Sequence, residues 1–355
     1  MNKLHAIGKY LDQPRLVGKF SKSVPTILVA GGAAFTFNHI RNSHNQKKRD
    51  EFIKKGSVLA ATIGSALIAT RGMRPLKING KTILRGFEGL SEKIDLKELA
   101  QKNTELIDNF VKNHKVDKDT NEILQRAKNK LISVEDIEKL YKKIGKTEEG
   151  KEFLSGENGL IPDPENIDSK HIFKEIGRLS VMGLVPVLGG MAGGVIGDRL
   201  TEKNWKEKIP NKIKEGSYQY LANIFLCNVG AGGALYMLEK AGKTTKASRA
   251  IGMIAGIMIT GVIGGSAIAN LIGKTCIDPI FNHGHKHKHR GRHEGLYSER
   301  KPEMLDVGLH VDDIATVAVL SGLKWIEPAL PILYSISGFR AGIGYRNGNH
   351  KKLEA

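Results

Sequence analysis

The chain has little of what catalytic and nucleic-acid-binding proteins are usually built from. It holds two cysteines in 355 residues, and aromatic residues make up 6% of it. Cys227 and Cys276 have no partner at the spacing of a metal or redox site, so we interpret both as packing residues. With so few aromatic residues, and with no zinc knuckle or recognition-helix pattern among the basic runs, no nucleic acid is expected as a partner.

Catalytic motifs are missing as well. The sequence contains no nucleotide-binding glycine loop, no catalytic triad and no zinc-protease helix, so we expect neither an enzyme nor a cofactor. Residues 1–23 hold no continuous apolar run, which argues against a cleavable signal peptide. The first apolar segment would then have to direct membrane insertion itself.

Acidic residues are scarce relative to basic ones. There are 37 Asp and Glu against 55 Lys and Arg, a formal net charge of +18. The stretch 74–178 is almost neutral, so the excess lies in the segments that join the apolar stretches. Lys and Arg concentrate beside membrane spans because their side chains reach toward phosphates and are attracted by anionic lipid. The bilayer, with anionic lipid in it, is therefore the expected partner.

What the sequence does have is apolar segments. A membrane helix needs about 20 apolar residues. The third, fourth and fifth segments approach or reach that length, whereas the first two are shorter and fit short spans, interfacial helices or buried helices of a soluble domain; we favour spans. The six segments cover 24–37, 56–70, 179–197, 218–238, 250–273 and 314–339.

Small residues recur every fourth position in two of these segments. In water each interior glycine of a helix costs about 1 kcal/mol relative to alanine, whereas in lipid small residues at this spacing let two helix backbones approach. The mean hydropathy of −0.25 leaves a soluble protein with a buried helical hairpin as the alternative. The uncharged stretch 250–273 favours the membrane. The predicted helix-packing residues are Gly189, Gly193, Gly197, Gly261, Gly265, Ala269 and Gly273.

Between the second and third segments the pattern is that of a soluble helical domain. Asp95 and Ser133 stand where they would cap helices, each followed by apolar residues at helical spacing. We therefore predict an all-α fold, a polytopic transmembrane helical bundle of four to six spans with an inserted soluble helical domain. Its parts are an N-terminal membrane hairpin (1–73), the helical domain (74–150), a linker (151–170), and a glycine-rich membrane domain (171–345) with a histidine-rich basic loop (282–301).

Two sets of polar residues inside the apolar segments are candidate substrate-binding residues. Lys324 and Glu327 stand at i and i+3 beside Pro328, which frees a backbone carbonyl, and a charged pair at a helix break can form a binding site. The alternative is a solvated pair between two short helices. Asn223 and Asn228 in the fourth segment could line a polar pathway or hydrogen-bond between helices.

A histidine cluster is the candidate metal site. Neutral imidazoles in a loop bind zinc, nickel or copper weakly. Four interleaved Lys and Arg side chains would repel a divalent cation, so a basic loop facing lipid is the competing interpretation. The histidines are His283, His285, His287, His289 and His293.

These patterns support two functions, and neither names a substrate. The favoured one is a multi-pass protein of a bacterial inner membrane or an organelle that acts as a solute channel or transporter. The other is a membrane scaffold that binds a partner or anionic lipid through its helical domain and basic loops. A homo-oligomer and a protein partner at the helical domain stay open. Counting basic residues in short loops favours the side of 41–55, 199–217 and 274–313 as cytoplasmic.

Overall fold

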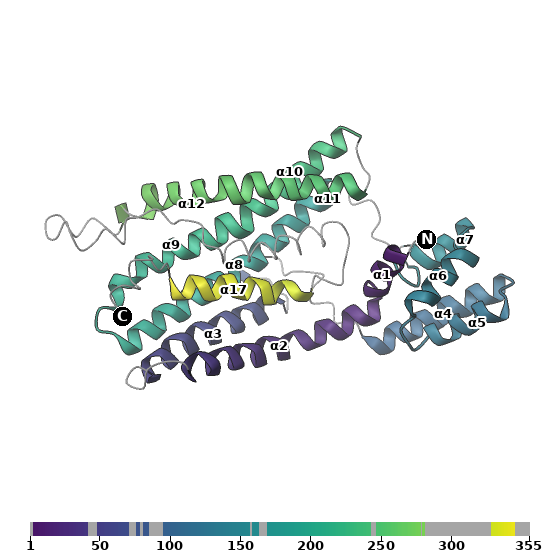
Figure 1. Cartoon of the computed structure of the whole chain (residues 1–355), viewed down its shortest axis with the longest axis horizontal. Coiled ribbons are helices and arrows are strands. Elements are labelled where there is room, and N and C mark those ends of the chain that lie inside the picture. The colour runs from purple at the N-terminus through teal and green to yellow at the C-terminus, as the bar shows by residue number, and fades with distance from the viewer. Residues whose placement is uncertain are drawn as a thin grey trace. The chain divides into compact units, whose positions relative to one another are not determined.

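The computed structural model resolves the chain into two compact units (Figure 1). The helical unit comprises residues 1–24, 89–168 and 318–329, and the apolar unit comprises 25–88, 169–317 and 330–355. The structure describes residues 3–41, 48–70, 76–78, 81–84, 95–156, 158–162, 169–242, 246–277, 279–280 and 328–344.

The four helices of the helical unit between residues 96 and 155 begin at side-chain caps. The Asp95 carboxylate accepts a hydrogen bond from the Lys97 N–H, and the Ser133 hydroxyl accepts one from the Asp136 N–H, as their sequence positions predict. Such caps satisfy N–H groups that have no partner within the helix. The helices are α1 (Lys3–Leu11), the first part of α2 (Pro14–Arg41), α4 (Leu96–Asn113), α5 (Lys118–Ala127), α6 (Val134–Lys143) and α7 (Glu148–Ser155).

The start of the chain packs into the core of the helical unit, whereas the sequence predicts it as a basic flank of the first membrane hairpin. Ala6 is fully buried in a core that it shares with Ile107, Leu124 and Ile137. Fixed in this way, α1 covers apolar residues of the domain that helices α4 to α7 leave open. This contact joins residues more than 100 positions apart, so no local pattern predicts it.

The expected linker 151–170 begins later than predicted. α7 continues to Ser155, and Leu160 and Ile161 are buried in the same core. Their backbone N–H groups donate to the carbonyls of Phe153 and Leu154, at 2.8 and 2.9 Å. Glycine and proline near this segment suggested a loop, but its apolar residues complete the domain.

The stretch 74–150 is not wholly helical. Strands β1 (Leu76–Ile78) and β2 (Lys81–Leu84) pair antiparallel, with Ile78 opposite Lys81. The sequence between them is Asn-Gly, the pair that most favours a two-residue hairpin connection. That signal was available in the sequence, and the expectation of helix alone overlooked it.

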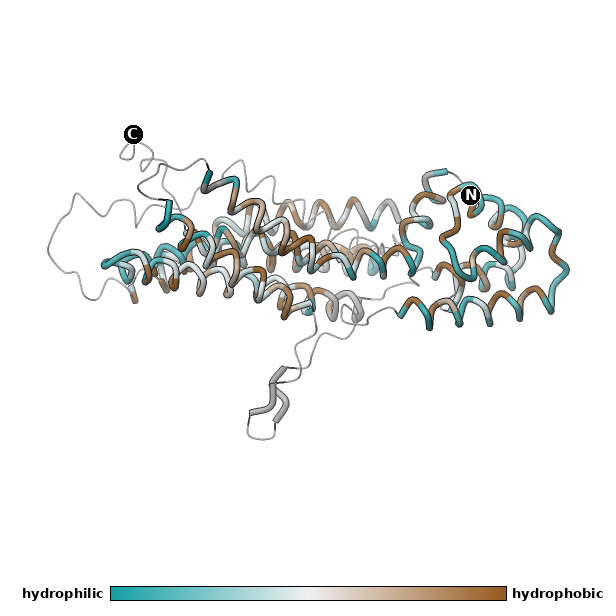
Figure 2. The backbone as a smooth tube through the Cα atoms, turned by 90° about the horizontal axis from the view of Figure 1, so that it is seen from below, coloured by the Kyte–Doolittle hydropathy of each residue, from teal (hydrophilic) through white to brown (hydrophobic). Residues whose placement is uncertain are grey.

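Within the residues that the structure describes, four helices are long and apolar enough to cross a membrane: 48–70, 176–201, 205–240 and 251–277. They coincide with the second to fifth predicted segments. The first segment lies in α2, which is not among the four, and 314–327 of the sixth lies outside the described residues. Apolar residues concentrate along the middle of these helices (Figure 2). Besides the second part of α2 and the strands β1 and β2, the described elements of the apolar unit are α3 (Lys48–Thr70), α8 (Ser169–Thr201), η2 (Trp205–Lys208), α9 (Ile209–Tyr220), η3 (Leu221–Phe225), α10 (Leu226–Lys240), α11 (Lys246–Ile257), η4 (Met258–Gly265), α12 (Ser266–Ile272), η5 (Gly273–Ile277) and α17 (Leu330–Ile343).

Glycines of α8 face two neighbouring helices. A Cβ atom on Gly189 or Gly193 would lie 2.0 Å from Ser65 Oγ or 2.5 Å from the Ser57 carbonyl oxygen of α3, and one on Gly197 would lie 2.8 Å from Lys54 Cα. A Cβ on Gly190 or Gly194 would lie 1.8 or 2.0 Å from the carbonyl oxygens of Gly338 and Gly342 in α17. Because these atoms belong largely to backbone, α8 can pack this closely only without side chains.

The second set of small residues faces α9, η3 and α10. A Cβ on Gly261 would lie 2.0 Å from Cys227 Sγ, and one on Gly265 would lie 2.7 Å from Ala222 Cα. Ala269 is buried against Tyr218 and Ala222. Gly273 is looser, because its Cβ would meet Lys214 Cε at 3.5 Å.

Candidate functional site

A file of polar side chains runs along the inward face of the apolar helical segment 205–240. Glu215, Gln219 and Asn223 succeed one another at i, i+4 spacing, which places them on one face of the helix. Each is at most 3% exposed. Lys212, one turn before Glu215, is 5% exposed and extends the file toward the start of α9.

Hydrogen bonds link the middle of this file. Gln219 Nε2 donates to Glu215 Oε1 at 2.7 Å, and Asn223 Nδ2 donates to Gln219 Oε1 at 3.0 Å. A buried amide or carboxylate without a partner would cost several kcal/mol, roughly 2–7 for a neutral group. The side chains therefore partly satisfy one another along the helix.

The charged side chains of the file interact with groups on other helices. Lys212 Nζ lies 3.0 Å from Asp198 Oδ2 of α8 and donates to the Gly342 carbonyl of α17 at 2.6 Å. Glu215 Oε1 lies 3.8 Å from Arg340 Nε of α17. Two positive and two negative side chains therefore meet in the interior, and their formal charges cancel.

Asn228 continues the file beyond a distortion in the helix. It is 1% exposed, and its Nδ2 contacts Ser180 Oγ of α8 at 3.5 Å. A residue five positions after Asn223 would point away from the same face of a regular helix. The π-helical turn η3 takes in an extra residue and rotates the next part of the helix, which brings Asn228 back toward α8.

The file is long in comparison with a membrane. From Lys212 to Asn228 the helix rises about 24 Å at 1.5 Å per residue. The hydrocarbon core of a bilayer is about 30 Å thick. Polar side chains are therefore present along most of the length of helix that would lie inside the bilayer.

At the end of the apolar unit near Lys212, a carboxylate outside the apolar helices joins α3 to the turn after α8. Glu202 accepts hydrogen bonds from Lys54 and from Lys208, the latter at 2.6 Å to Oε1. Partial burial opposes the charged carboxylate, but these two lysines outweigh it and hold the pKa of Glu202 below its usual value. Glu202 therefore stays ionised and ties the two helix ends together.

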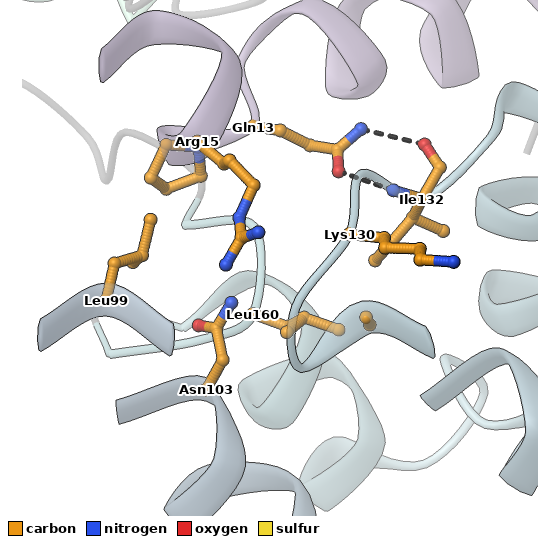
Figure 3. A pocket seen from close by; sticks show the side chains of 9 residues that line it. Gln13, Arg15, Leu99, Asn103, Lys130, Ile132 and Leu160 are labelled. Atoms are coloured by element: carbon orange, nitrogen blue, oxygen red, sulfur yellow. Dashed lines mark hydrogen bonds between the residues drawn. The ribbon is translucent and has the colours of Figure 1, made fainter. Parts of the chain in front are cut away.

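The helical unit holds a small pocket near the start of α2 (Figure 3). The Gln13 amide makes two hydrogen bonds with the backbone of Ile132 at its wall, both 2.8 Å long. The cavity measures about 10 Å³, room for about one water molecule. We therefore interpret it as part of a docking contact and not as a ligand site.

Of the predicted site residues, Asn223 and Asn228 belong to the polar file. Lys324, Glu327 and the five histidines from His283 to His293 lie outside the described residues. Within the part of the chain that the structure describes, no group of three or more His, Cys, Asp or Glu side chains could hold a metal ion.

Sequence reasoning missed Asp198, Lys212, Glu215, Gln219 and Arg340. The position of 199–217 between two apolar segments predicts a connecting loop, whereas α9 already begins at Ile209. The repeat of polar residues at 215, 219 and 223 was the available signal, since it has helical spacing and continues into an apolar segment.

In comparisons with protein-family models, curated proteins and solved structures, no match to this chain was found.

Proposed function

We propose that the protein is a multi-pass membrane protein that gives a polar solute a route across the bilayer. The observation that carries the proposal is the buried polar file on the inward face of the helical segment 205–240. Polar and ionisable side chains are costly inside a membrane and commonly mark pathways for solutes or ions. Four helices of sufficient length and apolar character support the membrane setting.

The chemistry of the file favours a small solute that forms hydrogen bonds. Its charges are balanced by the pairs Lys212–Asp198 and Glu215–Arg340. The amides of Gln219, Asn223 and Asn228 each offer both donors and acceptors. A solute moving along the file could exchange these hydrogen bonds one at a time.

Flux measurements on purified protein in liposomes test the proposal. Neutral solutes such as urea and glycerol are followed by light scattering, and protons and potassium by trapped dyes. We expect wild-type protein to pass at least one of them, and Glu215→Gln to lower that flux at least tenfold. Glu239→Gln is the matched control, because Glu239 is exposed near the end of α10 and should leave the flux unchanged.

Loss of fold must be separated from loss of flux. Removing one partner of a buried ion pair can cost about 3–5 kcal/mol, since it leaves the other charge uncompensated. The double variant Glu215→Gln, Arg340→Gln keeps the charge balanced and should fold better, yet pass less solute than wild type. Wild-type flux in the folded double variant, or no flux of any solute through wild-type protein, would show the proposal to be wrong.

A membrane scaffold is the second candidate function. The helical unit favours it, because this unit has its own core and its helices expose charged faces. A partner could dock there without any solute crossing the membrane. Absent flux from a protein that is folded and inserted would favour this function over transport.

A further inference from the structure

The turn between α8 and α9 joins two of the helices that are long and apolar enough to cross a membrane. Only residues 202–204 separate the ends of those two helices. If the helices cross, as the proposed function requires, this turn lies at the membrane surface. It would meet lipid headgroups directly.

Trp205 stands in this turn between two cations. Arg199 Cζ lies 5.9 Å and Lys206 Nζ lies 5.8 Å from the centroid of its ring. Cations at this distance are attracted to the face of an indole, which holds their long side chains near one another. Tryptophan is itself enriched at the interface between membrane and water.

Two carboxylates at this end of the unit are paired with other lysines. Glu202 is paired with Lys54 and Lys208, and Asp198 with Lys212. The turn's remaining cations are exposed: Arg199, Lys203 and Lys206. Glu207 is the one further acidic side chain in the described turn 199–208, so an excess of positive charge faces outward.

We propose that Arg199, Lys203 and Lys206, arranged around Trp205, bind the phosphate of an anionic phospholipid headgroup. A guanidinium can donate two parallel hydrogen bonds to a phosphate, and the two ammonium groups add charge. The indole would lie beside the glycerol region of the same lipid. Each cation near an anionic surface is worth about fivefold in lipid preference, so the three together give about a hundredfold.

Fluorescence quenching of Trp205 tests this site in the full chain. The sequence has two tryptophans, so Trp325→Phe leaves Trp205 as the sole emitter. The protein is placed in phosphatidylcholine vesicles that contain a small, equal fraction of either brominated phosphatidylglycerol or brominated phosphatidylcholine. We expect stronger quenching by the brominated phosphatidylglycerol, because the anionic lipid is enriched at the site.

Two charge-matched triple variants control for the overall charge of the protein. The variant Arg199→Gln, Lys203→Gln, Lys206→Gln should lose the difference between the two lipids. The variant Lys112→Gln, Lys115→Gln, Lys118→Gln removes the same charge from exposed positions of the helical unit and should keep it.

The outcomes separate this inference from the proposed function. Equal and strong quenching by both lipids would overturn the headgroup site while leaving the membrane setting intact. Quenching by neither lipid would place Trp205 away from the bilayer and would overturn both. A preference that survives removal of the three cations would also refute the site.

Discussion

Among the residues that the structure describes, Asp117 has the most clearly shifted pKa. Its carboxylate accepts a hydrogen bond from Lys143 and another from the Thr120 N–H, where it caps α5. These contacts, the one from Lys143 first, lower the pKa of Asp117 from 3.8 to about 2. Because the folded-state pKa is depressed, the stabilising effect is present above about pH 4 and is lost as the pH falls toward 2. A carboxyl NMR titration should give a midpoint near pH 2.

The control for this titration is Lys143→Gln, which removes the largest cause of the shift. The midpoint of Asp117 should then rise toward its ordinary value, while the cap from Thr120 keeps it somewhat below. A wild-type midpoint close to 3.8 would contradict the pairing. So would a midpoint that Lys143→Gln leaves in place.

At the level of helices, the contact between α8 and α17 depends on missing side chains. In Gly190→Ala the new Cβ atom would lie 1.8 Å from the Gly338 carbonyl oxygen. Backbone cannot move aside as a flexible side chain can, so the helices must separate, at a cost of about 1–3 kcal/mol. Denaturant unfolding in detergent, followed by circular dichroism, measures the loss.

Gly177→Ala is the matched control on the same helix. Its Cβ atom would meet nothing within 4 Å, so the substitution should be neutral or should stabilise α8 by up to about 1 kcal/mol. Equal stability of the two variants would mean that α8 and α17 do not pack through Gly190.

The docking of the chain start on the helical unit depends on Gln13. This buried amide both donates to the Ile132 carbonyl and accepts from the Ile132 N–H. Gln13→Ala leaves both backbone groups without that partner, which should cost about 1–3 kcal/mol. Hydrogen exchange at the Ile132 amide should accelerate accordingly. Gln101→Ala, which removes an exposed bond to Glu105, should leave that exchange rate unchanged.

The elements that sequence reasoning predicted are those whose cause is local. Asp95 and Ser133 cap their helices because the capped N–H groups lie two or three residues further on. Asn223 and Asn228 are candidates from the sequence because an amide is conspicuous in an apolar segment, and their role in binding a solute stays a prediction. Each of these signals can be read within one turn of helix.

The unpredicted part of the candidate site depends on distant partners. From the sequence alone, Glu215 looks like a loop residue. The fold places Arg340, 125 positions later, beside it. Lys212 can be buried because its ammonium group pairs with Asp198 of α8 and donates a hydrogen bond to a carbonyl at the end of α17. The π-helical turn η3 changes the face of the helix on which Asn228 lies, and a regular helical period does not predict that change. Tertiary packing decides all three.

Considered as a whole, the apolar unit places basic side chains at the end where α3 begins and α8 ends. Lys54 and Lys208 meet at Glu202 there. A Cβ atom on Gly273 would lie 3.5 Å from Lys214, which brings the start of η5 to the same end. Because loops rich in Lys and Arg stay in the cytoplasm, we expect this end to face it.

Cys276 reports the orientation, since it is exposed in η5 whereas Cys227 is buried. In intact cells a membrane-impermeant maleimide should leave the protein unlabelled, and permeabilising the membrane should expose Cys276 to it. Cys276→Ser must abolish that labelling, which shows that Cys227 does not contribute. Labelling of Cys276 in sealed cells would put the basic end outside. Since the lysines and arginines of this end would then face away from the anionic cytoplasmic surface, the charge argument for the orientation would be wrong.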